Sequence, residues 1–184
     1  ILSTLNIAKE NSYSLILIGL IFGLITILRF HLLPEIAFAL IYCSRKNFIY
    51  RAKFLSIGFL LTFIPLGFLD WATWGYPFHS IIYNLYMNIF KGVAKNFGTK
   101  PFYYYLGKNI QHWNVLFIPF CYFSYLGFKK QPIFLWVALI NLLSLSLIAH
   151  KEIRFIFLFI ICFFISSGMG VAEFYASLSN KRLL

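Results

Sequence analysis

Four ionisable side chains stand together in a short segment between two apolar runs, namely His150, Lys151, Glu152 and Arg154. A connecting turn is usually built from Gly, Asn, Asp or Ser, so this composition is unusual. On a helix, His150 and Arg154 would share a face and Glu152 would point elsewhere. In an irregular turn, the cations can converge on a phosphate while the carboxylate orients them. The alternative is two cations that reach a polar surface beside a local ion pair. The sequence favours the phosphate-binding interpretation.

A second candidate is Asp70, which ends the apolar run 63–69. A carboxylate at the edge of such a run is costly to desolvate, and it marks a functional site by default. The alternative is an interfacial or capping residue at a helix end, and the sequence does not decide between the two. Glu35 lies four residues after His31, so these two side chains can share one helical face. A polar contact inside the fold explains that pair.

The third candidate is a Gly-Thr-Lys-Pro turn at residues 98–101, which Gly98 and Thr99 open. An aromatic run that ends at Tyr105 follows it, and further Trp and Tyr residues lie between positions 71 and 83. Tyr and Trp are enriched where a membrane meets water. We therefore expect residues 70–112 to form an amphipathic layer at that boundary. Stacking on a sugar or covering a lipid chain is the alternative use of these rings.

Composition sets the environment of these groups. The chain has 184 residues, of which 61% are apolar and 11% charged, and 16 Lys plus Arg against 5 Asp plus Glu give a net charge of +11. About a quarter of an ordinary soluble domain is charged. A nucleic-acid-binding protein displays its cations on a polar face, which this chain lacks, so no nucleic-acid partner is expected. We predict an integral, multi-pass protein of the endoplasmic reticulum membrane if eukaryotic, or of the inner or plasma membrane if bacterial.

Six apolar stretches can form membrane helices, at residues 13–28, 32–43, 54–69, 113–128, 132–149 and 155–171. A span needs about 20 apolar residues, so the second stretch either is a partial helix or joins the first. Pro34 followed by Glu35 is typical of a first helical turn. We therefore expect an all-α, polytopic transmembrane bundle with five or six membrane helices, forming a single domain over residues 1–184.

The Lys and Arg residues of the loops predict the orientation. Alternating crossings place the clusters at residues 45–53, 129–130 and 181–182 on one side, which we assign to the cytoplasm. Residues 70–112 and the turn at His150 then lie outside the cytoplasm. Glu10 precedes the first stretch and is expected to be solvated. Because no positive region or cleavage site precedes that stretch, it is not a signal peptide. We expect the chain to be the middle or C-terminal part of a longer protein.

Other chemistries lack support in the sequence. The four histidines are scattered with no i, i+4 pair, so no metal site is predicted. Cys43, Cys121 and Cys162 lack metal-ligand spacing and are predicted to be small buried hydrophobic residues. No glycine-rich phosphate loop or nucleophile elbow occurs. We therefore expect no cofactor.

The order of these features resembles one family. Asp70 comes first, followed by Trp-Gly at 74–75, Tyr-Asn at 83–84, Phe-Gly-Thr-Lys-Pro at 97–101 and His-Lys-Glu-Ile-Arg-Phe at 150–155. This order resembles the family 22 glycosyltransferases, the lipid-phosphate-mannose-dependent mannosyltransferases of N-glycan and GPI-anchor assembly and their bacterial relatives. The last motif is the most specific, and the resemblance covers residues 19–160. Phe102 stands where the family has Trp.

The resemblance implies a GT-C-like fold and an inverting glycosyltransferase. The sugar would pass from a polyprenyl-phosphate donor to a hydroxyl of a glycan or glycolipid acceptor, on the non-cytoplasmic membrane face. The implied substrate-binding residues are Asp70, Gly98, Thr99, Tyr105, His150, Lys151, Glu152 and Arg154. The family's catalytic base belongs to a short acidic motif in its first outer loop. No acidic pair occurs near the start of this chain, so no catalytic residue is assigned, and the base is expected before residue 1.

Two other functions stay open. The missing acidic motif also fits a truncated, inactive remnant or a non-catalytic membrane subunit. A transporter fits less well, because transporters usually place ionisable residues at mid-membrane. In this sequence they gather at the ends of the apolar stretches.

Overall fold

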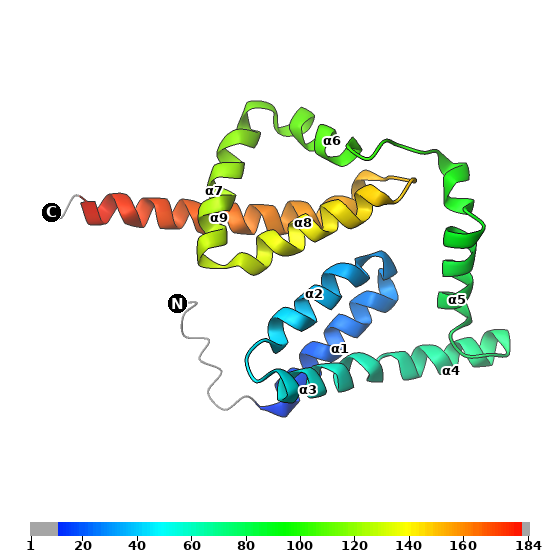
Figure 1. The fold of residues 1–184 in the computed structure, drawn as a ribbon. Coiled ribbons are helices and arrows are strands. Elements are labelled where there is room, and N and C mark those ends of the chain that lie inside the picture. The colour runs from blue at the N-terminus through cyan, green and yellow to red at the C-terminus, as the bar shows by residue number, and fades with distance from the viewer. Residues whose placement is uncertain (1–10, 182–184) are drawn as a thin grey trace. The chain divides into compact units, whose positions relative to one another are not determined.

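The computed structural model describes residues 11–181, and every regular element among them is helical (Figure 1). The all-α prediction is therefore confirmed for this range, whereas Glu10 and Arg182 lie outside it. The α-helices are α1 Ser12–Leu28, α2 Leu33–Ser44, α3 Phe48–Leu61, α4 Phe63–Trp74, α5 His79–Leu85, α6 Tyr104–Trp113, α7 Phe117–Lys130, α8 Pro132–Leu147 and α9 Phe157–Lys181. Shorter turns are the 3₁₀ segments η2 Phe30–Leu32, η4 Val93–Phe97, η5 Asn114–Leu116 and η6 Ile153–Ile156, and the π turn η3 Tyr86–Phe90.

Each of the six predicted apolar stretches contains a helix. Two helices in the described range are long and apolar enough to cross a membrane, Phe48–Trp74 and Ile153–Ser179, each of 27 residues. The first consists of α3 and α4, and the second of η6 and most of α9. Ser12–Leu28, Phe30–Ser44 and Pro132–Leu147 are apolar but shorter. The number of crossings, five or six, stays a prediction.

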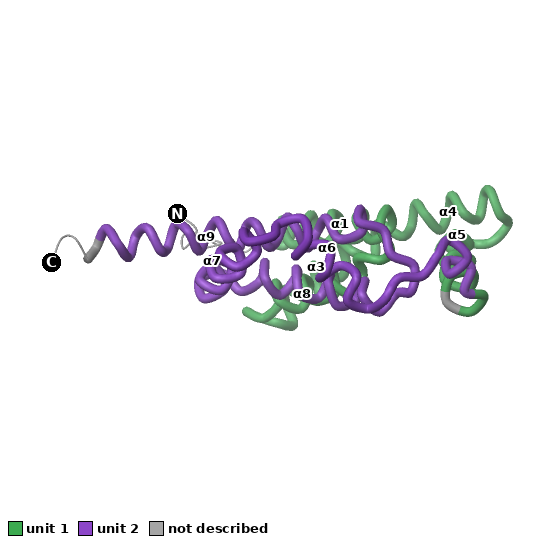
Figure 2. Tube along the Cα trace, turned by 90° about the horizontal axis from the view of Figure 1, so that it is seen from above, with its two compact units in different colours: residues 1–91 green, residues 92–184 purple. Residues whose placement is uncertain are grey.

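The chain divides into two compact units, residues 1–91 and 92–184, which Figure 2 colours separately. In the first unit, α1 packs against α3 through glycines. A Cβ atom on Gly19 would lie 2.2 Å from the Leu55 carbonyl oxygen, and one on Gly58 would lie 2.0 Å from that of Ile16. Such close approach through small residues is typical of helix packing in membranes.

Helix α4 extends one turn beyond its expected end at Asp70. It stops at Trp74, where Gly75 adopts a φ of 84° and its N–H donates to the Trp71 carbonyl over 3.0 Å. Only glycine takes this left-handed conformation without strain, so Gly75 is what ends the helix. The stretch 70–112, which is expected to form an amphipathic layer, contains α5 and all of α6 but its last residue.

In the second unit, α9 packs against both α7 and α8 (Figure 1). Serine hydroxyls join α7 to α9, with Ser124 Oγ 2.7 Å from Ser167 Oγ and Ser166 Oγ donating to the Ser124 carbonyl over 3.0 Å. Gly127 adds to this contact, because a Cβ on it would lie 1.9 Å from the Ser166 carbonyl oxygen. Small and hydroxyl-bearing residues therefore let these two helices touch at their backbones.

Helix α8 is tied to the start of α9 by Asn141. Its side chain is fully buried, and its Oδ1 accepts the Phe159 N–H over 3.2 Å. Tyr105, Leu145 and Phe163 belong to the buried core around this contact. This bond therefore holds the first turn of α9 against α8.

The predicted burial of the cysteines is only partly correct. Cys162 is buried and Cys43 is half-buried, but Cys121 is exposed. Cys121 belongs to α7, whose packed residues include Ser124 and Gly127. The sequence prediction was wrong for Cys121 because an apolar run does not reveal which face of its helix packs.

Candidate functional site

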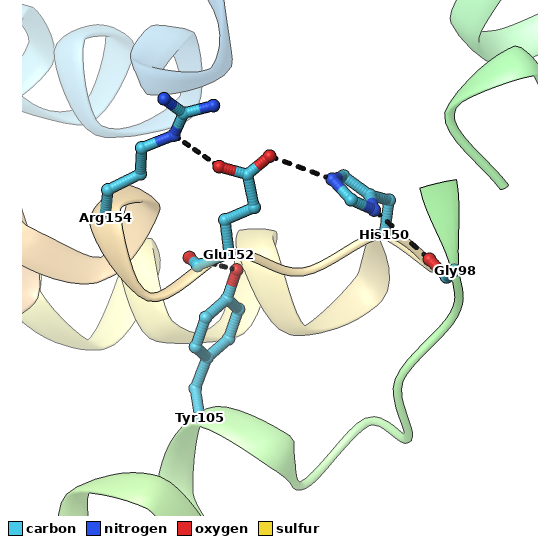
Figure 3. Close-up of polar contacts among 5 residues, drawn as sticks. All are labelled: Gly98, Tyr105, His150, Glu152 and Arg154. Atoms are coloured by element: carbon cyan, nitrogen blue, oxygen red, sulfur yellow. Dashed lines mark hydrogen bonds and ion pairs between the residues drawn. The ribbon is translucent and has the colours of Figure 1, made fainter. Parts of the chain in front are cut away.

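The charged segment of the second unit lies in an irregular turn. Helix α8 ends at Leu147, and η6 begins only at Ile153. His150 and Arg154 therefore do not share a helical face; both instead reach the carboxylate of Glu152 (Figure 3). His150 Nε2 lies 3.1 Å from Glu152 Oε1, and Arg154 Nε pairs with Oε2. His150 and Arg154 thus meet at the Glu152 carboxylate. The expected convergence of the cations on a phosphate stays a prediction.

His150 has an acceptor beside each ring nitrogen. Its Nε2 faces Glu152, and its Nδ1 lies 3.1 Å from the carbonyl oxygen of Gly98. A neutral imidazole has one N–H, whereas the imidazolium donates from both nitrogens. The hydrogen bond to Glu152, and then that to Gly98, raise the pKa of His150. Hydrogen bonds from His150 and then Arg154 lower the pKa of Glu152. The arrangement therefore favours a cation and an anion side by side.

The turn at residues 98–101 is joined to the charged segment at two points. Besides the Gly98–His150 contact, the Lys100 N–H donates to the Ala149 carbonyl over 3.0 Å. Gly98 has a φ of 94° and a ψ of 149°, a conformation open essentially to glycine alone. No atom lies within 4 Å of the place that a Cβ would take, so backbone conformation, not space, requires glycine there. Thr99 is exposed beside this link.

Tyr105 contacts the charged segment through a hydrogen bond to its backbone. The side chain is 1% exposed, and its hydroxyl donates to the Glu152 carbonyl over 3.1 Å (Figure 3). Burial raises the pKa of Tyr105 to about 12, so the phenol stays a neutral donor. Tyr105 thus contacts the backbone of the segment, whereas the ionic side chains lie beyond it.

The two cations of the segment differ in exposure. Lys151 is 6% exposed, and its ammonium donates to the carbonyl of Ile148, which follows the last residue of α8. Burial lowers the pKa of Lys151. A lysine in this position satisfies a helix-end carbonyl. The Arg154 side chain is 65% exposed, and its terminal Nη groups point away from Glu152 (Figure 3). Arg154 is therefore the cation that the segment presents outward.

Asp70 belongs to the first unit, unlike the other predicted site residues. It is 4% exposed, and both of its oxygens accept hydrogen bonds from Ser80. Oδ2 accepts the backbone N–H over 2.8 Å, and Oδ1 accepts the hydroxyl over 2.5 Å. Ser80 is the second residue of α5, whose first N–H groups lack partners within the helix. Asp70 therefore caps the helix that follows it, a partnership the sequence did not reveal.

His79 is a further residue that was not predicted from the sequence. Its ring lies between those of Trp74 and Tyr83, at centroid distances of 4.8 Å and 5.3 Å. Both contacts are near-parallel, with interplanar angles of 22° and 15°. The density of aromatic residues around position 79 was the available signal. The pairing itself depends on the turn between α4 and α5.

The sequence comparisons with known proteins all point to mannosyltransferases. A sequence model described as "Alg9-like mannosyltransferase family" matches residues 2–184. The chain is 28% identical over 195 residues to the "Probable Dol-P-Man:Man(7)GlcNAc(2)-PP-Dol alpha-1,6-mannosyltransferase" of Schizosaccharomyces pombe, covering 96% of this chain and 35% of that protein. It is 30% identical over 115 residues to "GPI mannosyltransferase 3" of Candida albicans, covering 56% and 23%. The match to the protein of the same name in Yarrowia lipolytica has 28% identity over 97 residues, covering 53% and 19%.

The chain thus spans about a third or less of the length of these curated relatives. No solved structure gives a significant match. The family model, in contrast, covers nearly every residue, including the two motifs that meet at His150 and Gly98. The chain belongs to the Alg9-like mannosyltransferase family.

Proposed function

We propose that this chain is part of a multi-pass membrane mannosyltransferase and contains its site for a polyprenyl-phosphate-linked sugar donor. The whole protein transfers the sugar to a hydroxyl of a glycan or glycolipid acceptor, with inversion, on the non-cytoplasmic face. Family membership supports sugar transfer. The donor class and the inversion rest on the motif resemblance, and the membrane face rests on the distribution of Lys and Arg.

The observation that carries the proposal is the ionic group around Glu152. One carboxylate orients both the imidazole of His150 and the guanidinium of Arg154. Arg154 uses Nε for this contact and keeps its two Nη groups for a ligand, a geometry suited to phosphate oxygens. We assign Arg154 as the direct phosphate contact and His150 as a second positive group beside it.

These charges suit the chemistry of the transfer. The bond between the anomeric carbon and the phosphate oxygen breaks, and the lipid phosphate leaves with the electron pair. Donors aimed at the oxygen that gains charge lower the barrier. A new bond forms between the acceptor oxygen and the anomeric carbon, and a base takes the hydroxyl proton. No residue of this chain is assigned as that base.

Of the remaining predicted residues, three are proposed to position the charged segment and one to touch the substrate. Lys151 and Tyr105 are buried, and we propose that they position the segment through Ile148 and Glu152. Gly98 holds His150 through its carbonyl. Thr99 is exposed beside that contact and is proposed to touch the substrate directly.

The test is mannose transfer by the full-length protein in membranes. A short-chain polyprenyl-phosphate mannose serves as donor, and decyl α-mannotrioside serves as acceptor. We expect Arg154→Gln to lower kcat/KM about 100-fold, because one donor to the developing charge is lost. The control is Lys130→Gln. Lys130 also forms an exposed ion pair, with Glu173 at 3.0 Å and a side-chain exposure of 62%, and its loss should leave transfer unchanged.

Equal effects of the two substitutions would refute the role of Arg154. Absence of transfer by the wild-type protein would support the alternative, a non-catalytic subunit or an inactive remnant.

A further inference from the structure

The turn between α4 and α5 holds a stack of three rings in the first unit. The imidazole of His79 lies between Trp74 and Tyr83, nearly parallel to both. Tyr76 closes the group, because its hydroxyl hydrogen-bonds His79 Nδ1 and its ring meets the imidazole edge-on at 4.6 Å. His79 is thereby fixed by contacts on both faces and at one nitrogen.

Two further bonds fix the backbone that carries this stack. Ser80, next to His79, is bound through its N–H and its hydroxyl to the buried carboxylate of Asp70. Asp70 lies one helical turn before Trp74 on α4. The same carboxylate therefore sets the distance between the helix that carries Trp74 and the helix that carries His79.

Trp74 is well ordered by these contacts yet remains accessible. One face of its ring stacks on His79, but the residue is still 62% exposed, so much of the rest of its surface is open. Trp71 on the same helix is similarly exposed, at 57%. Among the residues that the structure describes, its ring meets only that of Phe68, at 6.0 Å and a tilt of 55°, and stacks on none. The two tryptophans thus differ in support rather than in exposure.

We propose that Trp74 is a saccharide-stacking residue for the acceptor glycan, and that His79 and Asp70 hold its ring in place. This inference rests on the proposed function. The apolar C–H face of a pyranose ring packs well on an aromatic face that is flat, open and rigid. A ring fixed in advance avoids the cost of ordering on binding.

The surroundings of Trp74 favour a sugar over a lipid chain. Its ring is backed by an imidazole, with a phenol hydroxyl and the Asp70–Ser80 bonds close by. Polar groups of this kind are costly to place against acyl chains. A tryptophan that only anchors a helix at the membrane boundary needs no such backing, and Trp71 shows that arrangement.

The experiment measures the KM for each substrate in membranes that contain the full-length protein, using the donor and acceptor probes named above. We expect Trp74→Ala to raise the KM for decyl α-mannotrioside about tenfold and to leave the KM for the donor unchanged. Trp74→Phe keeps an aromatic face and should restore most of the affinity. Trp71→Ala is the matched control and should change neither KM. His79→Leu should raise the acceptor KM by a smaller factor, because the ring remains but loses its backing.

A binding measurement keeps this inference separate from the proposed function. Purified protein in nanodiscs is mixed with α-mannotriose, and saturation-transfer NMR reports contact with the sugar. The proposal expects a signal in the wild type and in Trp71→Ala, and its loss in Trp74→Ala, even if the wild-type protein transfers no mannose. If Trp74→Ala and Trp71→Ala each raised the KM for the donor and the KM for the acceptor by the same factor, Trp74 would be a membrane anchor. That result would overturn the proposal. A sugar signal that survives in Trp74→Ala would also overturn it.

Discussion

The carboxylate of Glu152 determines how the charged segment is arranged. It accepts from His150 at one oxygen and pairs with Arg154 at the other, while the backbone carbonyl of the same residue accepts from Tyr105. The sequence predicted that these residue types belong together. It did not predict that Lys151 is buried at a helix end while Arg154 is exposed, because neighbouring residues in an irregular turn have no fixed periodicity. The difference in their exposure is therefore a structural result.

The contact between His150 and Glu152 predicts a pH dependence of stability. The folded-state pKa of His150 is raised above its ordinary value of 6.5, so its contribution is fully present below that value and is lost as pH rises through the folded pKa. The pKa of Glu152 is lowered below 4.5, so its contribution is present above 4.5 and is lost as pH falls through the folded pKa. The pair should therefore stabilise the fold most between about pH 4.5 and 6.5.

Thermal unfolding of the purified protein in detergent checks this expectation. Wild type should unfold at a higher temperature than His150→Gln near pH 6, and the difference should shrink steadily toward pH 9. His112→Gln, at an exposed histidine of α6, is the control and should show no such trend. A constant difference between wild type and His150→Gln across this range would contradict the ionic contact.

At the scale of the elements, small residues let pairs of helices approach closely. The α7–α9 contact depends on Gly127, whose Cβ position is occupied by the Ser166 carbonyl. Helix α9 also contains Gly168, which has no atom within 4 Å of its Cβ position. A methyl group added at Gly127 should therefore disturb the α7–α9 contact, whereas one added at Gly168 should not.

We expect Gly127→Ala to destabilise the second unit by about 1–3 kcal/mol, because the methyl group forces the helices apart. Gly168→Ala should be neutral or stabilising by up to about 1 kcal/mol, since alanine favours the helix and meets no obstacle. Unfolding of the purified protein in detergent, followed by circular dichroism, measures both. Equal stability of Gly127→Ala and wild type would show that α7 and α9 do not touch at this point.

Helix positions were largely predictable from the sequence, whereas several helix ends were not. Apolar runs located the six longer helical segments, and Pro34 correctly indicated the first turn of α2. The start of α5 depends on a cap from Asp70, ten residues earlier and on another helix. Local patterns do not contain such a contact. The stacking of His79 on Trp74 was not predicted either, because it depends on the turn between α4 and α5 and not on a local pattern.

For the whole molecule, the distribution of Lys and Arg predicts the orientation in the membrane. Lys46 belongs to the cluster assigned to the cytoplasm, and Lys95 belongs to the stretch assigned to the other side; both are exposed. Orientation follows from loop charge, but the number of crossings does not, because several helices are shorter than a full span.

Labelling of single cysteines tests the orientation. In a variant whose three native cysteines are replaced, Lys95→Cys should react with a membrane-impermeant maleimide in sealed membranes whose non-cytoplasmic face is outward. Lys46→Cys should react only after permeabilisation, because the charge distribution assigns its loop to the cytoplasm. The reverse pattern would invert the assigned topology.

The bond between His150 and Gly98 joins residues 52 positions apart, and that between Tyr105 and Glu152 joins residues 47 apart. At a synthesis rate of about 5–20 residues per second, the ribosome needs roughly 3–10 s to pass from the first partner to the second. During that interval the glycine turn has been made and its histidine has not. The contact between the two motifs therefore forms only after residue 150 has been made, and a nascent chain that stalls before that residue carries only half of it.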